Sequence, residues 1–519
     1  MSDHGLILRE RGIESADIAQ GAAPGLSDAP IPITSVLVAN RGEIAARVLR
    51  TVRAMGLRAL LIAHPVDAHA PALELADAVH WFDPASSPIS AFLDIASIVQ
   101  AGRAMGADAI HPGYGFLSEN ANFARAVSEA GMVFIGPGHE AIDLMGDKVR
   151  AREFVASRNF PVAPSAIEDH DPSTFLARAK ALGMPLLIKP SAGGGGKGMR
   201  IVRDPAMLAE EIERARSEAQ RYFGDGRLYA ERYFERPRHI EVQIFGDHQG
   251  NIVHLHEREC SIQRRFQKII EEAPAPALSD VLRTAICEAA AGIARAVGYA
   301  NAGTVEFIYE DGAFYFLEMN TRLQVEHPVT EAITGLDLVE LQIRIAAGLP
   351  LPLMQEEITC SGHAIELRIC AEEPANDFAP SIGTILKLQM PPHVRFDAGV
   401  TEGSQVTTAF DPMIGKLIVH GHNRAHAIER ARLALRQVVL FGVQTNMPYL
   451  QRLLSDPDMI AGAVHTGLIG EKPDLAHEPE PDAALLSHLA ALAAPLVPEL
   501  RREVAQIPAL HAALGGWRN

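Results

Sequence analysis

The sequence predicts an α/β protein whose C-terminal part is α+β. Residues 35–63 read as a strand, a turn, an amphipathic helix and a second strand, which is the opening of a doubly wound sheet. Residues 186–202 place a glycine-rich loop between two short β-like runs, and residues 303–320 read as a β-hairpin. With 519 residues the chain is long enough for about three domains.

Composition and charge exclude several classes of function. The chain is 48% hydrophobic and 21% charged, which is typical of a soluble globular protein, and its formal charge is −17. This acidic balance argues against nucleic-acid binding and against binding to anionic membranes. The four cysteines show no metal-ligand spacing, which favours free thiols in a reducing compartment, and we expect a cytoplasmic protein. No window is apolar enough to predict a membrane span.

The first βαβ unit consists of a strand at 35–39, a helix at 43–55 and a strand at 59–63. A dinucleotide-binding fold is rejected because the GxGxxG fingerprint is missing. The Gly- and Pro-rich loop 111–120 follows a β-like segment, and loop geometry alone would explain its glycines. We assign this loop no chemical role, and we expect residues 1–34 to form a flexible arm without a secretory signal.

The glycine-rich segment has five glycines in the six positions 193–198. Such a run exposes backbone N–H groups and allows them to approach an anion closely. It is not a Walker A loop, because no Gly-Lys-Ser/Thr opens a helix. A flexible linker is the alternative, but β-like runs on both sides favour a lid over phosphates.

Acidic residues on the predicted hairpin form a candidate metal site. Glu306, Glu318 and Asn320 offer only oxygen ligands, which suits Mg²⁺ that also contacts nucleotide phosphates. A two-residue turn at Asp311-Gly312 would oppose residue 306 to residue 317 and send the two carboxylates to opposite faces. The metal site therefore requires an odd-length loop or a β-bulge in this hairpin, and we predict that one of the two is present.

Residues 318–326 alternate between charged or amide side chains and apolar or small ones. In an extended conformation one face carries two carboxylates, two amides and a guanidinium. A half-exposed strand would show the same alternation.

The run 318–328, Glu-Met-Asn-Thr-Arg-Leu-Gln-Val-Glu-His-Pro, resembles the signature of biotin carboxylases, the ATP-grasp component of biotin-dependent carboxylases. Segments 39–45, 111–120 and 257–268 also resemble this family, and the similarity extends from about residue 35 to about residue 470. The resemblance implies a pre-ATP-grasp domain at 35–147, an ATP-grasp domain at 148–358 with a lid at about 163–234, and a C-terminal biotin carboxylase domain at 359–472. A linker and a helical tail follow at 473–519.

The resemblance also implies which residues bind the nucleotide. Lys148 and Lys189 lie on the α- and β-phosphates, with Gly195 and Gly196 over the nucleotide. The adenine is read by a hinge strand that includes Glu231, Arg232 and Phe234, and His239 and Gln263 lie beside the nucleotide. Phe266 replaces the histidine of many relatives, so we expect no nucleotide contact from it.

The implied reaction is the MgATP-dependent carboxylation of biotin at N1′ with bicarbonate, through carboxyphosphate. Bicarbonate lies against Lys268, Arg322, Gln324, Val325 and Glu326, with Glu326 as general base. Arg368 stabilises the enolate-like ureido oxygen of biotin. Glu306, Glu318 and Asn320 hold Mg²⁺, with Mn²⁺ as an alternative. The catalytic residues are Glu326, Arg322, Arg368 and Lys268.

The implied partners are a biotin carboxyl carrier and a carboxyltransferase, within an oligomeric carboxylase complex. No Ala-Met-Lys-Met biotinylation motif is present, so biotin arrives on another chain unless the sequence is truncated. Two alternatives stay open. Another ATP-grasp ligase, of the carbamoyl-phosphate or carboxylate–amine type, would share the lid and the metal carboxylates. A non-catalytic nucleotide-binding subunit should have lost at least one catalytic or metal-binding residue, and all are present.

Overall fold

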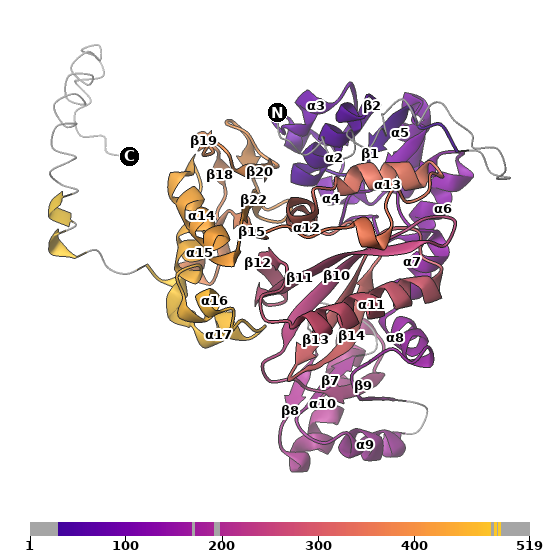
Figure 1. The fold of residues 1–519 in the computed structure, drawn as a ribbon, viewed down its shortest axis with the longest axis vertical. Helices are drawn as coiled ribbons and strands as arrows, with labels where there is room; N and C mark the ends of the chain where they lie inside the picture. The colour runs from indigo at the N-terminus through magenta and orange to yellow at the C-terminus, as the bar shows by residue number, and fades with distance from the viewer. Residues whose placement is uncertain (1–29, 169–171, 191–197, 479–481, 485, 489–519) are drawn as a thin grey trace. The chain divides into compact units, whose positions relative to one another are not determined.

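The computed structural model describes residues 30–168, 172–190, 198–478, 482–484 and 486–488 (Figure 1). The chain divides into two compact units, residues 1–475 and residues 476–519, and the description below concerns the first unit. Most of the predicted arm and most of the predicted tail lie outside the described residues. No described helix is both long enough and apolar enough to cross a membrane.

A parallel five-stranded sheet with the order β3-β2-β1-β4-β5 opens the chain and confirms the predicted βαβ unit. Apolar side chains cover both of its faces, as expected for a parallel sheet with helices on either side. Its elements are β1 (Ser35–Val38), α2 (Gly42–Ala54), β2 (Arg58–Ala63), η3 (Pro65–Asp67), α3 (Ala72–Leu75), β3 (Ala78–Trp81), α4 (Pro88–Phe92), α5 (Ile95–Met105), β4 (Ala109–His111), α6 (Ala121–Glu129), β5 (Val133–Phe134) and α7 (His139–Gly146).

The loop at 111–120 is fastened to the end of β1. The Asn40 side-chain amide donates hydrogen bonds to the carbonyls of Pro112 and Tyr114, at 2.7 and 2.8 Å. Gly113 has φ +64, and a Cβ there would meet the Asn40 side chain at 2.8 Å, so only glycine fits this close approach. The loop is therefore held in one conformation at the carboxyl edge of the sheet.

A smaller antiparallel sheet with the order β6-β9-β7-β8 carries the predicted lid region. Helices α9 and α10 pack on it and bury its apolar side chains. The β-like runs predicted on both sides of the glycine-rich segment are the strands β7 and β8, which pair with each other. The elements are α8 (Lys148–Ser157), β6 (Ser165–Ile167), α9 (Pro172–Ala181), β7 (Leu186–Pro190), β8 (Arg200–Val202), η4 (Pro205–Met207), α10 (Leu208–Phe223) and β9 (Leu228–Arg232).

An eight-stranded antiparallel sheet, β14-β13-β10-β11-β12-β15-β22-β20, runs through the middle of the first unit (Figure 1). Pairing of β12 with β15 carries this sheet across the predicted domain boundary at 358/359. The strands are β10 (Arg238–Gly246), β11 (Ile252–Arg264), β12 (Gln267–Ala273), β13 (Asn301–Glu310), β14 (Ala313–Asn320), β15 (His363–Cys370), β20 (Arg395–Ala398) and β22 (Met413–Gly421).

The hairpin β13–β14 contains the predicted bulge. Glu310 pairs with Ala313 and Phe307 with Phe316, but the register then shifts and Glu306 pairs directly with Glu318. Leu317 is the extra residue on β14. Directly opposed residues of an antiparallel pair point to the same face, so the bulge brings the two carboxylates together.

Helices cover the large sheet. α11 packs on β10 and β11, α12 on β11, β15 and β22, and α14 on β15 and β22. These helices are α11 (Asp280–Val297), α12 (His327–Thr334) and α14 (Arg424–Gln437). The remaining elements are α13 (Leu338–Ala346), η5 (Gln355–Glu357), β16 (Glu372–Glu373), η6 (Pro374–Asn376), β17 (Ala379–Pro380), β18 (Gly383–Thr384), β19 (Lys387–Gln389), β21 (Gln405–Val406), β23 (Val439–Phe441), α15 (Met447–Leu453), α16 (Pro457–Ala461), α17 (Leu468–Glu471) and η7 (Pro473–Ala476).

Candidate active site

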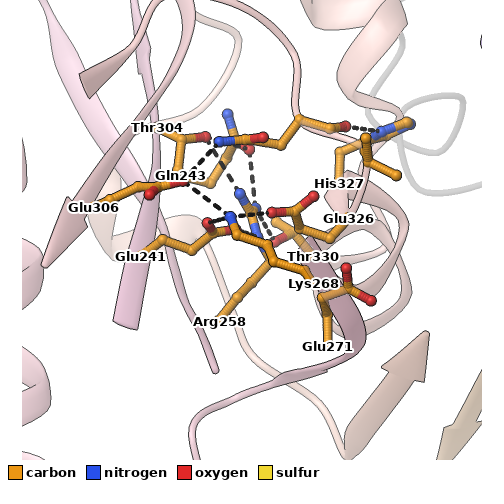
Figure 2. A network of polar contacts seen from close by, with 12 residues as sticks. Glu241, Gln243, Arg258, Lys268, Glu271, Thr304, Glu306, Glu326, His327 and Thr330 are labelled. Carbon is orange, nitrogen blue, oxygen red and sulfur yellow. Dashed lines mark hydrogen bonds and ion pairs between the residues drawn. The ribbon is translucent and has the colours of Figure 1, made fainter. Parts of the chain in front are cut away.

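A buried ammonium group lies at the centre of the candidate site (Figure 2). Lys268 Nζ donates to Glu241 at 2.5 Å, to Glu306 at 2.9 Å and to Glu326 at 2.5 Å. Glu241 and Glu306 are directly paired on β10 and β13, and Glu326 immediately precedes α12. The sheet register and the start of one helix therefore bring three carboxylates to one lysine.

The charges of this cluster support one another. Burial disfavours the ammonium, but the three carboxylates outweigh it and raise the pKa of Lys268 well above its usual range. In the same way, burial opposes ionisation of Glu306, yet Lys268 and His239 hold its pKa well below the usual range. Burial and Glu241 oppose the ionisation of Glu326, while Lys268 and Arg368 lower its pKa. Glu326 is thus ionised at neutral pH, which a general base requires.

A second buried cation, the guanidinium of Arg258, also binds this cluster. Arg258 is fully buried and donates to Glu241 at 2.5 Å and to the side chains of Gln243 and Thr330 at 3.0 and 2.9 Å (Figure 2). Glu241 therefore contacts two cations, Lys268 and Arg258. Our sequence analysis gave neither Glu241 nor Arg258 a role. Segment 257–268 has the composition of a solvated face, but β11 buries residues 257–263.

The predicted metal ligands lie together. Glu306 and Glu318 share one face of the hairpin, and the Asn320 amide donates to Glu306 at 2.9 Å. This set contains only hard oxygen donors, which fits Mg²⁺. His239, Glu241 and Glu306 also bring potential ligand atoms within 4.8 Å of one another. Lys268 contacts Glu241 and Glu306 of this second set, and Glu306 belongs to the predicted magnesium set as well.

The guanidinium of Arg322 is held by several acceptors. It donates to Glu119 at 2.9 Å, to Gln324 at 2.9 Å and to Asn320 at 3.1 Å. The Gln324 amide in turn donates to Glu306 at 3.1 Å. Glu119 comes from the 111–120 loop, to which we assigned no role, and its contact explains why that loop is fastened to the sheet.

Lys416 supports the predicted bicarbonate loop from the C-terminal part of the sheet. Its ammonium donates to the carbonyl of Val325 at 2.6 Å and lies 3.1 Å from Glu43, and it is fully buried. The Tyr114 hydroxyl donates to the same Glu43. Lys416 was not among the predicted site residues. Nothing in its local sequence shows that it meets residue 325.

Arg368 and Lys268 contact different carboxylate oxygens of Glu326, Oε2 and Oε1 respectively. Its Nη2 donates to Glu326 at 2.9 Å, and its Nε donates to Glu271 at 2.5 Å. Glu326 is therefore bound by two cations that we assigned to different substrates, Lys268 to bicarbonate and Arg368 to biotin. Glu271 orients the guanidinium of Arg368. Sequence analysis missed Glu271.

The predicted nucleotide residues divide between two places. Lys148, Lys189, Glu231 and Glu318 line one cleft with Tyr229 and Leu317. Within it, Lys148 Nζ lies 2.8 Å from Glu318, and Lys189 forms an ion pair with Glu231.

The other predicted nucleotide residues lie outside this cleft lining. His239 Nε2 is 2.8 Å from Glu306, and Gln263 pairs with Lys268, so both belong to the central cluster. The guanidinium of the exposed Arg232 lies over the Phe234 ring. Gly195 and Gly196 lie outside the described residues.

Comparison with known proteins decides the family. Family models match three consecutive segments: the biotin carboxylase N-terminal domain at residues 32–142, the carbamoyl-phosphate synthase L chain ATP binding domain at 147–354, and the biotin carboxylase C-terminal domain at 366–471. The biotin carboxylase of Haemophilus influenzae is 45% identical over 446 residues, 85% of this chain and 99% of that protein. The chain belongs to the biotin carboxylase family.

Solved structures and longer relatives agree with this membership. The biotin carboxylase domain dimer of Hydrogenobacter thermophilus 2-oxoglutarate carboxylase, in complex with MgADP, ADP and bicarbonate, is 43% identical, with a TM-score of 0.81, over 86% of this chain and 99% of that chain. The mitochondrial methylcrotonoyl-CoA carboxylase subunit alpha of Rattus norvegicus is 46% identical over 87% of this chain. The chain spans 63% of that relative's length.

The predicted fold class and enzyme class, an ATP-dependent ligase, are confirmed by this membership. Biotin carboxylases carry out the ATP- and bicarbonate-dependent half-reaction of biotin-dependent carboxylases, which is the reaction that the sequence led us to expect. The predicted roles of individual residues stay predictions.

Removal of the central ammonium should destabilise the fold. We expect Lys268→Met to lower the free energy of unfolding by about 3–5 kcal/mol, because three buried carboxylates lose a shared cation. Loss of the cation raises the pKa of these groups, so the folded state then binds more protons than the unfolded state above about pH 4.3. The loss of stability should therefore grow as the pH rises, as measured by urea denaturation at several pH values.

Lys387→Met is the matched control, since Lys387 forms an exposed ion pair with Glu402 at 2.9 Å. We expect no measurable change in its denaturation midpoint. Equal losses in the two variants, or a loss in Lys268→Met that shrinks with rising pH, would contradict the central role of Lys268.

Proposed function

We propose that this chain carboxylates biotin presented by a partner carrier, using MgATP and bicarbonate. One observation carries the proposal: the buried carboxylate of Glu326 contacts both Lys268 and Arg368, at 2.5 and 2.9 Å. Lys268 is expected on bicarbonate and Arg368 on biotin. The general base thus lies between the groups expected to bind the two substrates that are joined.

Activation of bicarbonate falls to the residues around Glu326. Lys268, Arg322 and the backbone at Gln324 and Val325 bind the anion, and Glu326 removes its proton. The deprotonated oxygen then attacks the γ-phosphorus of ATP, and the bond to the β–γ bridging oxygen breaks to release ADP. Lys416 holds the Val325 carbonyl and so keeps this loop in place.

Metal and nucleotide are assigned to neighbouring residues. Glu306, Glu318 and Asn320 hold Mg²⁺, which supplies neutralisation of the phosphate oxygens during phosphoryl transfer. Lys148 and Lys189, which line one cleft with Glu318, bind the phosphates.

Capture of the one-carbon unit falls to Arg368. Carboxyphosphate decomposes to CO₂ and phosphate, and the phosphate takes the N1′ proton of biotin. Arg368 stabilises the negative charge that develops on the ureido oxygen, and N1′ attacks CO₂. Glu271 holds the guanidinium in the orientation required.

We further propose that a biotin carboxyl carrier protein or domain and a carboxyltransferase subunit act with this chain in a carboxylase complex. Longer relatives are named methylcrotonoyl-CoA carboxylase subunit alpha and propionyl-CoA carboxylase alpha chain, which favours an acyl-CoA as the final acceptor. A reducing compartment such as the cytoplasm suits the four free cysteines.

The test of the function is a measurement of ADP release. We expect release to depend on bicarbonate and to be stimulated by free biotin, with carboxybiotin as product. An ATP-grasp ligase of the carbamoyl-phosphate type would instead respond to ammonia, and one of the carboxylate–amine type to an amine. ADP release that ignores biotin but responds to ammonia would overturn the proposal.

For Glu326→Gln we expect loss of turnover with nucleotide affinity retained, because the amide keeps the shape of the side chain but cannot accept a proton. The loss in kcat should be about 10²–10⁴-fold, the usual contribution of a general base. ADP binding by calorimetry should change little. A collapse of ADP affinity would show that Glu326 is structural.

For Arg368→Ala we expect biotin carboxylation to fall by about 10²–10³-fold, because a preorganised charge at the developing oxyanion is lost. Bicarbonate-dependent ATP cleavage without biotin should fall far less. Arg265→Ala is the control, since Arg265 forms an exposed ion pair with Asp377 at 2.9 Å. Equal loss of both activities in Arg368→Ala would contradict the assigned role.

A further inference from the structure

Two carboxylates face each other beside Arg368. Glu271 on β12 and Glu366 on β15 are directly opposed in the antiparallel register, so their side chains share one face of the sheet. Both are fully buried. The site described above uses Glu271 only as a partner of Arg368, and it does not use Glu366.

Glu366 lacks the contacts that an ionised buried carboxylate needs. Among the described residues, neither of its oxygens has a hydrogen-bond partner, and Oε2 of Glu271 has none either. An unpaired buried charge is very costly, and two like charges in adjacent positions add repulsion. One of the two carboxyl groups must therefore carry a proton.

The surroundings decide which group is ionised. Arg368 donates to Glu271 at 2.5 Å, so Glu271 has a cation of its own. The charged groups that face Glu366 are Lys416 on β22, Arg368 on β15, Glu271 on β12 and Glu326 before α12. Lys416 is already bound to Glu43 and to the Val325 carbonyl.

The pKa directions agree with this geometry. Burial raises the pKa of Glu366 well above its usual range, with Lys416 opposing and Glu271 adding to the shift. Burial also raises the pKa of Glu271 to about 7, with Arg368 opposing. As the pH rises through about 7, Glu271 therefore ionises first, and the single proton that remains lies on Glu366.

We propose that Glu271 and Glu366 act as a carboxylate–carboxylic acid pair that holds a single proton and positions Arg368 for biotin. This inference rests on the function proposed above. Ionised Glu271 orients the guanidinium through Nε, which leaves Nη2 for Glu326. Protonated Glu366 keeps a second negative charge away from Arg368, where it would compete with the charge that develops on the ureido oxygen. Both glutamates are positioning residues.

The activity test compares Glu271→Gln with Glu366→Gln over a range of pH. We expect Glu271→Gln to lower kcat for biotin carboxylation about tenfold or more above about pH 7, where Glu271 is ionised, because Arg368 loses a charge-assisted hydrogen bond. For Glu366→Gln, a neutral isostere of the acid, we expect a smaller loss at neutral pH. Glu366→Gln should also lose the alkaline decline in kcat that ionisation of Glu366 causes in the unmodified protein.

Bicarbonate-dependent ATP cleavage without biotin separates this inference from the proposed function. Glu366→Gln should retain it to within about threefold, because Glu366 has no hydrogen bond to the residues assigned to bicarbonate or to the nucleotide phosphates. Glu366→Gln with the same loss as Glu271→Gln, or with an unchanged alkaline limb, would overturn the pair. Failure of the unmodified protein to carboxylate biotin would overturn the proposed function instead. In that case the stability test below would still show whether Glu366 is protonated in the folded protein.

The stability test measures thermal unfolding at several pH values. The folded state holds a proton on Glu366 above the usual glutamate pKa of about 4.3, so the unmodified protein loses stability as the pH rises through the range between the two pKa values. Glu366→Gln removes that loss, so its Tm relative to the unmodified protein should rise with pH.

Glu272→Gln is the control on the same strand. Glu272 is buried but ion-paired with Arg424 at 2.6 Å, and the hydrogen bonds of His363 and Arg424 lower its pKa against the effect of burial. Because the pKa of Glu272 is lowered, its ionisation adds stability only as the pH rises toward the usual glutamate pKa of about 4.3. The relative Tm of Glu272→Gln should therefore fall up to that pH and stay level above it, where the relative Tm of Glu366→Gln rises. Parallel slopes in the two variants would show that Glu366 is ionised and would overturn the proposal. Glu366→Gln should remove one component of the infrared carbonyl absorption of protonated carboxylic acids. An unchanged spectrum in that region would also contradict the proposal.

Discussion

The ion cluster around Lys268 is the interaction on which the site depends. Glu241, Glu306 and Glu326 come from two strands and a helix start, and each is buried where an isolated carboxylate would be very unfavourable. A single ammonium that donates to all three removes most of that cost. The same contacts hold Glu326 in its ionised form. The buried ammonium of Lys268 thus both stabilises the sheet around the site and keeps the general base Glu326 ionised.

The register of the strands determines where the carboxylates of the site lie. Glu306 is opposed to Glu241 on β10 and to Glu318 on β14, so three carboxylates of three neighbouring strands share one face. A shift of one residue would turn the shifted strand's carboxylate to the other face. The bulge at Leu317 is therefore a requirement of the site, because the tight turn at Asp311 alone would oppose Glu306 to Leu317.

Much of the fold and part of the site follow from local sequence. The βαβ opening, the strands beside the glycine run and the bulge could be predicted because each depends on periodicity or turn length within a short segment. Glu119, Glu271 and Lys416 could not be predicted as site residues, because their partners Arg322, Arg368 and Val325 lie far away along the chain. Their local sequences are ordinary for a loop and for buried strands. Only tertiary pairing identifies them.

Charge alternates along the site, and this pattern explains why a neutral acid is needed at its end. Glu306, Lys268, Glu326, Arg368 and Glu271 form a chain in which every cation lies between two carboxylates. Glu366 comes next, and Lys416 beside it is already shared by Glu43 and the Val325 carbonyl. An ionised Glu366 would therefore have to take its counter-charge from Arg368, which would weaken that residue's hold on both Glu326 and the ureido oxygen. A protonated Glu366 is neutral, so it does not compete with Glu326 and the ureido oxygen for the charge of Arg368.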